Sequence, residues 1–206
     1  MKLLIRALIL RFIGIGLAAL LITATGAALT PVTGQCAMQA PSTEPEINYL
    51  PDITLTNQDG QPVTLASLKG KPALVSFIHA SCKGVCELMT GKMKSVADDL
   101  GKDGAKVMMV SITTDPAEDG PAELKAYAEK EGVSSDGFIF LTGKPAKVKQ
   151  VLQLYGVNQK RGDNEMTHVF ELFLLGPDGR QIRRYHGLNI DAAKVAGDVQ
   201  QALARS

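Results

Sequence analysis

Two cysteines, Cys82 and Cys86, stand where an apolar run gives way to a helical pattern. The run, residues 73–78, is typical of a short buried strand. Beyond the cysteines, apolar residues recur with the spacing of one helix face, at Val85, Leu88, Met89, Met93, Val96, Ala97 and Leu100. Because the N-terminal N–H groups and the dipole of a helix favour anions, a thiolate forms there more easily than in water. The position therefore favours a reactive or metal-binding pair over two inert core cysteines.

The elements around this pair alternate between strands and helices. In chain order the pattern predicts a hairpin at 53–65, strands at 73–78, 106–112 and 138–141, helices starting near 85, 119 and 145, a second hairpin at 169–186 and a last helix at 192–203. Strands separated by helices pair in parallel, whereas a hairpin adds an antiparallel edge. We therefore predict an α/β fold, a mixed central sheet with helices on both faces and an extra N-terminal β-hairpin.

The first 29 residues predict export. Lys2, Arg6 and Arg11 precede an apolar segment at 12–22, followed by small residues up to Ala28, as in a secretory signal. Cleavage after Ala28 is one candidate, but the stretch is also long enough to remain as a membrane anchor, so both readings stay open. Residues 30–46 then predict a linker, and residues 47–206 one folded domain. The expected location is the periplasm or the outer face of the inner membrane.

The net charge argues against a nucleic-acid partner, and the sequence around the third cysteine argues against lipidation. The chain carries a formal net charge of +1, and the three basic residues of the leader leave 1 − 3 = −2 for the rest, so nucleic acid is not an expected partner. Cys36 follows Gln35, where a lipidation site needs a small residue. An unpaired cysteine in the tail is therefore the expectation for Cys36.

With these elements in place, the chain resembles the Sco/SenC family, exported thioredoxin-like proteins that bind copper and help assemble the dinuclear copper site of cytochrome c oxidase. The resemblance covers residues 47–206. It rests on the hairpin with its Asp-Gly turn, on Cys-x-x-x-Cys at Cys82 and Cys86, on Asp115-Pro116, and on Thr167-His168 before VFELFLLGPDG. It implies a thioredoxin-like fold.

Two departures from the family pattern bear on thiol acidity and partner choice. Lys83 and Glu87 follow the two cysteines at positions where family members often carry Pro. Thr167 stands where the residue before the motif histidine is often Asp. Neither departure removes a ligand.

The resemblance implies that Cys82, Cys86 and His168 bind copper. Two thiolates and one imidazole form a soft, low-coordination set suited to Cu(I), and the imidazole also tolerates Cu(II). Ligands from two separate loops can hold the ion and release it to a partner's thiols. The implied role is a metallochaperone rather than an enzyme. Its implied partners are a copper donor and a cuproenzyme client, foremost the copper subunit of cytochrome c oxidase.

Other readings of the cysteines stay open. A structural disulfide is one, and a thiol–disulfide oxidoreductase with Cys82 and Cys86 as its redox pair is another, since turnover through a mixed disulfide needs no metal. Thioredoxin-type enzymes, however, use Cys-x-x-Cys and place a cis-proline where this chain has Thr167-His168. A peroxiredoxin site expects Thr-x-x-Cys, and a catalytic zinc site expects a further carboxylate or histidine at a recognisable spacing, which the sequence lacks.

Five further residues are weaker candidates. His79 lies next to the cysteines, and a supporting role beside the ligands is the less favoured alternative to a structural one. His186 is expected to be structural, and for Met166, two residues before His168, a thioether ligand is the less favoured alternative. Asp115 and Asp119 form either a docking or site-adjacent surface, or simply a turn and a helix cap.

Overall fold

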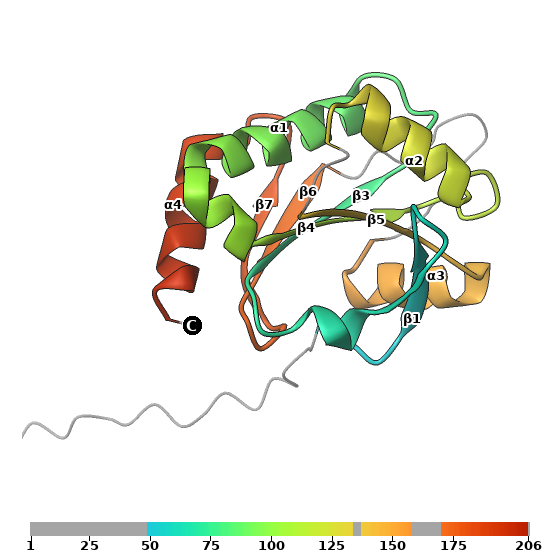
Figure 1. Ribbon diagram of the computed structural model, residues 1–206, viewed down its shortest axis with the longest axis horizontal. Coiled ribbons are helices and arrows are strands. Elements are labelled where there is room, and N and C mark those ends of the chain that lie inside the picture. The colour runs from blue at the N-terminus through green and yellow to red at the C-terminus, as the bar shows by residue number, and fades with distance from the viewer. Residues whose placement is uncertain (1–48, 134–136, 158–169, 206) are drawn as a thin grey trace, which may run out of the picture. The chain divides into compact units, whose positions relative to one another are not determined.

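The computed structural model describes residues 49–133, 137–157 and 170–205 (Figure 1). Its elements, in chain order, are β1 (Thr54–Asn57), β2 (Pro62–Thr64), η1 (Leu65–Leu68), β3 (Ala73–Ile78), α1 (Val85–Leu100), η2 (Gly101–Lys106), β4 (Met108–Thr113), α2 (Pro121–Lys130), β5 (Phe138–Thr142), α3 (Pro145–Leu154), β6 (Glu171–Leu175), β7 (Gln181–His186) and α4 (Ala192–Leu203). The predicted leader and linker, residues 1–46, lie outside the described residues.

The strands form one mixed sheet of seven in the order β2-β1-β5-β4-β3-β6-β7. The three strands that alternate with helices, β3, β4 and β5, pair in parallel. The two hairpins are antiparallel and lie at opposite edges of the sheet, β1 against β5 and β6 against β3. The predicted mixed sheet with an added N-terminal hairpin is confirmed.

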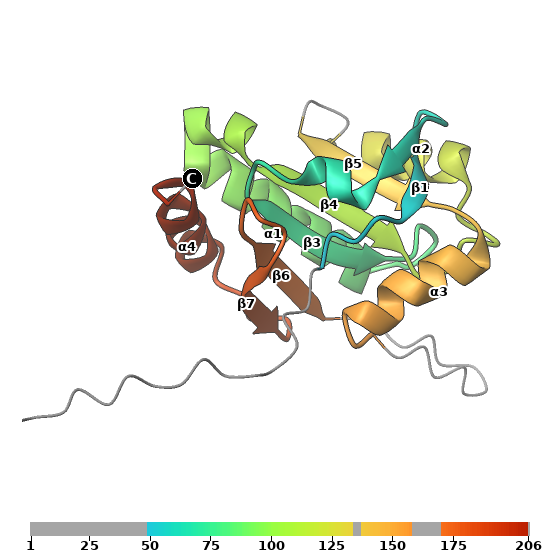
Figure 2. The same ribbon diagram turned by 90° about the horizontal axis from the view of Figure 1, so that it is seen from below.

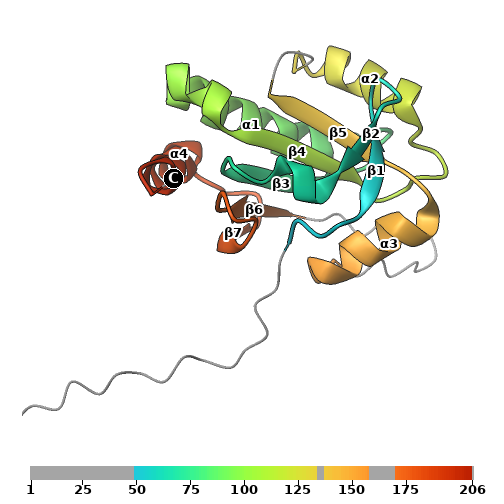
Figure 3. The same cartoon turned by 60° about the horizontal axis from the view of Figure 1, so that its bottom comes forward.

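Helices cover both faces of this sheet. Buried side chains of α1, α2 and α4 pack on one face, and those of α3 and η1 pack on the other. Figure 3 shows α1 and α2 on one side of the strands and α3 on the opposite side, and Figure 2 shows the face that carries α3. Side chains along β3 alternate between the two cores: Leu74 and Ile78 lie under α1, whereas Val75 and Phe77 lie under α3.

Leu88 departs from the expected apolar face of α1. Its side chain is 42% exposed, although Met89 and Met93 beside it are buried as predicted. A helix turns about 100° per residue, so Leu88 lies about 140° around the axis from Met93 and points away from the sheet. The apolar pattern placed the helix correctly and this residue wrongly.

The register of the sheet brings three chain segments together at one end of the central strands. Ser76 of β3 pairs with Ser111 of β4 in parallel and with Leu172 of β6 in antiparallel. The chain therefore leaves β3 and β4, and enters β6, at the same end of the strands. This end is the cysteine edge, because Cys82 and Cys86 follow β3 there. Among the residues that the structure describes, no helix is both long enough and apolar enough to span a bilayer.

Candidate functional site

Cys82 and Cys86 lie at that edge, where the chain passes from β3 into α1 (Figure 1). The loop between them and the strand makes a tight turn, closed by a 3.0 Å hydrogen bond from the N–H of Cys82 to the carbonyl of His79. Both cysteine side chains are more than nine-tenths buried, and they are not joined in a disulfide. Their thiols are hydrogen-bonded to each other, so the structure brings the predicted pair together.

The helix N-terminus does not make Cys86 acidic. Burial raises the pKa of its thiol to about 12, from an ordinary value of 9.0. The N–H of His79, 3.4 Å from Cys86 Sγ, lowers this pKa, whereas Cys82 and Asp119 raise it further. The expectation of an easily formed thiolate is therefore wrong for Cys86, because the loss of hydration outweighs the hydrogen bond from the His79 N–H. A metal that binds Cys86 has to displace its proton.

His79 is buried against the cysteine pair. Its Nε2 lies 3.2 Å from Ser81 Oγ and 4.0 Å from Asp119 Oδ1. Its Nδ1 is a buried nitrogen that finds no hydrogen-bond partner within the described part of the chain. Buried polar atoms without partners are uncommon, so the nitrogen fits a site that takes up a further group. The structure thus places His79 beside the thiols, where the sequence analysis expected it.

Asp119 is neither a helix cap nor part of a surface. The residue before α2 is Gly120, and no side chain caps that helix. Asp119 is only 2% exposed, and its Oδ2 accepts hydrogen bonds from Ala80 N at 3.0 Å and Thr113 Oγ1 at 2.6 Å. The helix-cap reading is wrong because the carboxylate turns inward to satisfy two buried donors. The turn reading of Asp115 is confirmed, since its carbonyl accepts the N–H of Asp119 at 2.9 Å.

Glu87 holds the loop between the two cysteines, a role that the sequence analysis missed. Its carboxylate accepts the N–H of Gly84 at 3.1 Å and pairs with Lys130 at the end of α2. The signal was present in the sequence, because a glutamate three residues after a helix-starting position is typical of a capping box. No comparable signal marks Asp119, whose partners lie 39 and 6 residues away along the chain.

Several predicted residues contribute nothing to this site or cannot be placed in it. Cys36, Met166 and His168 lie outside the described residues. His186 lies at the end of β7 with its side chain 77% exposed, and its Nδ1 is 3.3 Å from Glu171 Oε1. Within the described ranges no group of three His, Cys, Asp or Glu side chains is placed to hold a metal ion.

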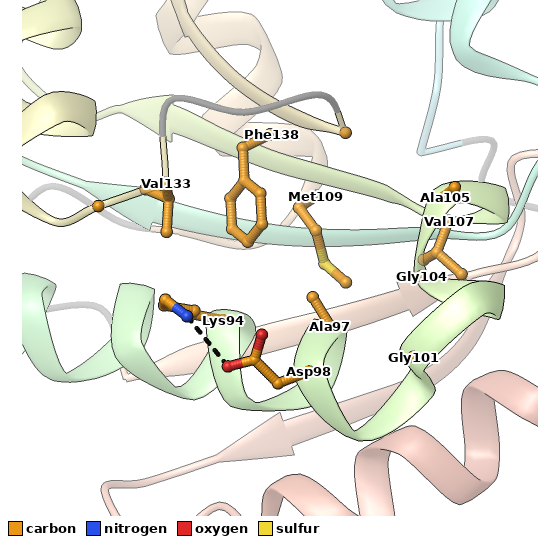
Figure 4. A pocket seen from close by; sticks show the side chains of 12 residues that line it. Lys94, Ala97, Asp98, Gly101, Gly104, Ala105, Val107, Met109, Val133 and Phe138 are labelled. Atoms are coloured by element: carbon orange, nitrogen blue, oxygen red, sulfur yellow. Dashed lines mark hydrogen bonds and ion pairs between the residues drawn. The ribbon is translucent and has the colours of Figure 1, made fainter.

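A cavity of about 210 Å³ lies elsewhere, at the far end of α1 (Figure 4). Lys94 and Asp98 of α1 face Met109 and Phe138 of the sheet across it. β4 begins at this end and runs towards the cysteine edge, so the cavity and the thiols are at opposite ends of the parallel strands. The cavity therefore has no part in the thiol site.

A mixed sheet with helices on both faces and a Cys-x-x-x-Cys pair at the end of β3 defines a thioredoxin-like protein with a buried thiol site. The family model described as SCO1/SenC matches residues 42–204. The chain belongs to the SCO1/SenC family. The predictions of the family and of the thioredoxin-like fold are both confirmed.

Individual relatives agree with this assignment. The SCO1 protein homolog of Bacillus subtilis is 31% identical over 173 residues, which cover 81% of this chain and 90% of the relative. The structure of Bradyrhizobium japonicum ScoI with copper bound is 33% identical, with a TM-score of 0.62 over 73% of this chain and 96% of that one. A structure of BsSco, a member of the Sco family of cytochrome c oxidase assembly proteins with a disulfide switch, is 30% identical, with a TM-score of 0.67 over 76% and 94%.

Proposed function

We propose that the chain is an exported metallochaperone that binds Cu(I) through Cys82, Cys86 and His168 and delivers it to a cuproenzyme. The observation that carries the proposal is a pair of buried thiols, already in hydrogen-bond contact, at one edge of the sheet. Thiolates are soft ligands that select Cu(I), and an imidazole adds a third ligand that also suits Cu(II). The likeness to ScoI with copper bound supports the choice of metal.

The third ligand in this proposal is His168, and chain length supports it. His168 is two positions before Phe170 in the sequence, which is at most about 7 Å of extended chain. Phe170 directly precedes β6, which starts at the edge where β3 ends. This short chain length supports His168 as the third ligand of the proposal.

Copper loading is coupled to protons and to the redox state of the pair. Binding through thiolates releases the thiol protons, so affinity rises with pH until both thiols are ionised. A disulfide between Cys82 and Cys86 offers no thiolate, so the pair has to be reduced before Cu(I) binds. Release follows when thiols of the client replace the ligands one at a time.

The client in this proposal is the copper subunit of cytochrome c oxidase, and a separate carrier donates the copper. The likeness to BsSco, a member of the Sco family of cytochrome c oxidase assembly proteins, supports this client. Export follows from residues 1–29, as a cleaved signal or an anchor, with residues 30–46 as a linker and residues 47–206 as the working domain. The site then faces the periplasm.

A second candidate function is a thiol–disulfide oxidoreductase. The hydrogen bond between the two thiols supports it, because a disulfide also requires the two sulfurs to approach each other. In that reaction one thiolate attacks a client disulfide, and the second thiol then displaces the client's sulfur. The client leaves as a dithiol and Cys82–Cys86 as a disulfide, so two electrons and two protons pass to the client.

An anaerobic copper titration of residues 47–206 separates these functions. The reduced wild type, Cys82→Ser and His168→Ala are titrated with Cu(I) against a chromophoric chelator, and bound copper is counted by metal analysis. One tightly bound copper in the wild type, lost in Cys82→Ser and weakened in His168→Ala, supports the chaperone. The oxidised wild type is the matched control and is expected to bind no Cu(I).

Two results contradict the proposal. A disulfide form that loads Cu(I) as tightly as the reduced form removes the cysteines from the ligand set. A reduced form that retains no copper, but whose disulfide exchanges readily with client thiols, makes the protein a reductase and His168 a bystander.

A further inference from the structure

One buried carboxylate beside the thiols has no place in the ligand set. Asp119 is 2% exposed, and its Oδ2 accepts hydrogen bonds from Ala80 N and Thr113 Oγ1 at 3.0 Å and 2.6 Å. Burying a carboxylate is costly unless its oxygens are hydrogen-bonded, so these two donors fix where the group can sit. The carboxylate thus joins the loop after β3 to the end of β4.

The β4 side of this junction is built to hold Asp119 in place. Thr113 Oγ1 donates to Asp119 and itself accepts the N–H of Asp115 at 2.9 Å. The carbonyl of Asp115 accepts the N–H of Asp119, also at 2.9 Å. The turn between β4 and α2 therefore holds both the side chain and the backbone N–H of Asp119 by hydrogen bonds. The carboxylate has little freedom to move.

On the other side of the junction, Ala80 is bonded to His79, and the backbone of His79 contacts both cysteines. Ala80 follows His79 in the turn closed from Cys82 N to the His79 carbonyl at 3.0 Å. The N–H of His79 is also directed at Cys86 Sγ, 3.4 Å away. A shift of Ala80 therefore changes the approach of Cys82 and the contact with Cys86 together.

We propose that Asp119 is a positioning residue for the cysteine pair, acting through its hydrogen bond to the backbone of Ala80. It keeps the loop after β3 in the conformation that holds the two sulfurs in contact. The part of this proposal that concerns copper rests on the proposed function. The part that concerns the distance between the thiols does not, because a disulfide requires the same approach.

Two substitutions distinguish the role of Asp119 as a hydrogen-bond acceptor from the role of its negative charge. Asp119→Asn can place its amide oxygen where Oδ2 lies and keep both hydrogen bonds, with its NH₂ group on the side of His79 Nε2. Asp119→Ala removes the acceptor and leaves Ala80 N–H and the Thr113 hydroxyl buried without it. If the role is positioning, Asn rescues what Ala loses.

A carboxylate at a distant place in the same fold supplies the control. Asp198 of α4 has its side chain 10% exposed and bonds to Tyr185 Oη at 2.8 Å and Arg183 Nε at 3.1 Å. It ties α4 to β7, and among the described residues its polar partners lie on β7 and not in the cysteine loop. Asp198→Ala therefore tests whether the loss of any buried carboxylate disturbs the thiols.

The experiment uses the full chain in mild detergent and two readouts. The first is the equilibrium constant for Cys82–Cys86 disulfide formation with glutathione, measured without metal. The second is Cu(I) affinity by competition with a chromophoric chelator. We expect Asp119→Ala to lower the disulfide constant about tenfold or more, since a looser loop lowers the effective concentration of one thiol at the other. Cu(I) affinity falls by a similar factor, whereas Asp119→Asn and Asp198→Ala stay within about threefold of the wild type.

The results divide clearly. A folded Asp119→Ala protein with both constants unchanged overturns the proposal, and so does an Asn variant as impaired as the Ala variant, because the charge would then be what matters. If Asp119→Ala does not fold, Thr113→Val decides: it removes the donor at 2.6 Å, and an unchanged glutathione constant overturns the proposal. A wild type that binds no copper defeats the proposed function, yet the glutathione constants still test Asp119.

Discussion

The backbone N–H of His79 lies 3.4 Å from the Sγ of Cys86. It is a hydrogen bond from the first residue after β3 to the first turn of α1, and it lowers the pKa of the thiol. Burial outweighs it and leaves that pKa at about 12. The contact therefore orients the sulfur of Cys86 more than it activates it.

The first prediction is that Cys86 reacts slowly with alkylating reagents. At pH 9 an ordinary thiol is half ionised, whereas a thiol with a pKa near 12 is only about one thousandth thiolate. In residues 47–206 carrying Cys82→Ser, Cys86 is the single thiol, and burial, the largest cause of the shift, remains. Its alkylation by iodoacetamide at pH 9 is expected to be at least about a hundredfold slower than in the same protein unfolded in urea.

The pH profile gives the sharper check. Because the pKa is raised, the rate in the folded protein keeps climbing about tenfold per pH unit from pH 8 to pH 10, while the unfolded protein levels off near pH 9. A folded-state rate that levels off below pH 9 contradicts the raised pKa.

The second prediction concerns two serines in the middle of the sheet. Ser76 Oγ and Ser111 Oγ are 2.9 Å apart on paired positions of β3 and β4, and both residues are at most 1% exposed. Ser76→Ala is expected to lower the free energy of unfolding by about 1–3 kcal/mol, because it leaves the Ser111 hydroxyl buried without this partner. Urea unfolding of the reduced domain measures the loss.

The double variant distinguishes a hydrogen bond from simple packing. Ser76→Ala with Ser111→Ala leaves no unpaired hydroxyl, so its loss of stability is expected to be smaller than the sum of the two single losses. Strictly additive losses count against a coupled pair. The Ser111 hydroxyl also donates to Met93 Sδ at 4.0 Å, a weak acceptor that remains when Ser76 is replaced.

Local sequence patterns were enough to predict the elements of this fold. Apolar periodicity located the strands and helices, and Gly132 and Gly156 follow α2 and α3 with positive φ angles of 65° and 69°, where residues with a side chain are strained. The proximity of Cys82 and Cys86 followed from their spacing at a strand-to-helix junction. Each of these signals lies within one element or at its end.

The chemical environment of the thiols was not predictable in this way. The acidity of Cys86 depends on how deeply α1 packs against the sheet, and Asp119 acts on Ala80 across 39 residues of chain. Leu88 fitted the apolar pattern but lies on the outer side of α1. Such properties arise from contacts between elements, which a pattern within one element does not contain.

The third prediction concerns the two contacts that the Glu87 carboxylate makes at the start of α1, with the Gly84 N–H and with Lys130. Its hydrogen bond with Lys130, and then that with the Gly84 N–H, lower the pKa of Glu87 below its ordinary value of 4.5. A carboxyl group whose pKa is lower in the folded state stabilises the fold above its unfolded-state pKa, and the stabilisation is lost as pH falls through the folded-state value. Wild type is therefore expected to be more stable than Glu87→Gln at pH 6, with the difference closing as the pH falls from 5 to 2.

Urea midpoints over this pH range check the third prediction, and a second ion pair on α1 supplies the control. Lys94 and Asp98 pair at 3.0 Å beside the cavity at the far end of α1, with side chains 46% and 67% exposed, away from the loop between the cysteines. In a Lys94→Met background, the stability difference between the protein with Glu87 and the protein with Glu87→Gln is expected to close over the same pH range. A gap between wild type and Glu87→Gln that stays constant down to pH 2 removes the ionised carboxylate as its cause.

The fourth prediction compares two glycines seven residues apart. Gly84, between the cysteines, has a φ of +103° and ψ of −73°, a conformation that residues with a Cβ rarely adopt. Gly91 lies inside α1, and an added Cβ would meet nothing within 4 Å at either position. Gly84→Ala is therefore expected to lower the free energy of unfolding by about 1–3 kcal/mol through backbone strain alone. Gly91→Ala is expected to raise it by about 0.5–1 kcal/mol, because alanine loses less conformational entropy in a helix.

The two variants also separate loop conformation from helix stability at the thiol site. Gly84→Ala strains the segment that Glu87 holds between Cys82 and Cys86, so its disulfide constant with glutathione is expected to fall together with its stability. Gly91→Ala stabilises α1 without touching that segment, so its disulfide constant is expected to match the wild type. If Gly91→Ala changes the disulfide constant as much as Gly84→Ala does, the approach of the sulfurs follows the stability of α1 rather than the conformation of the loop.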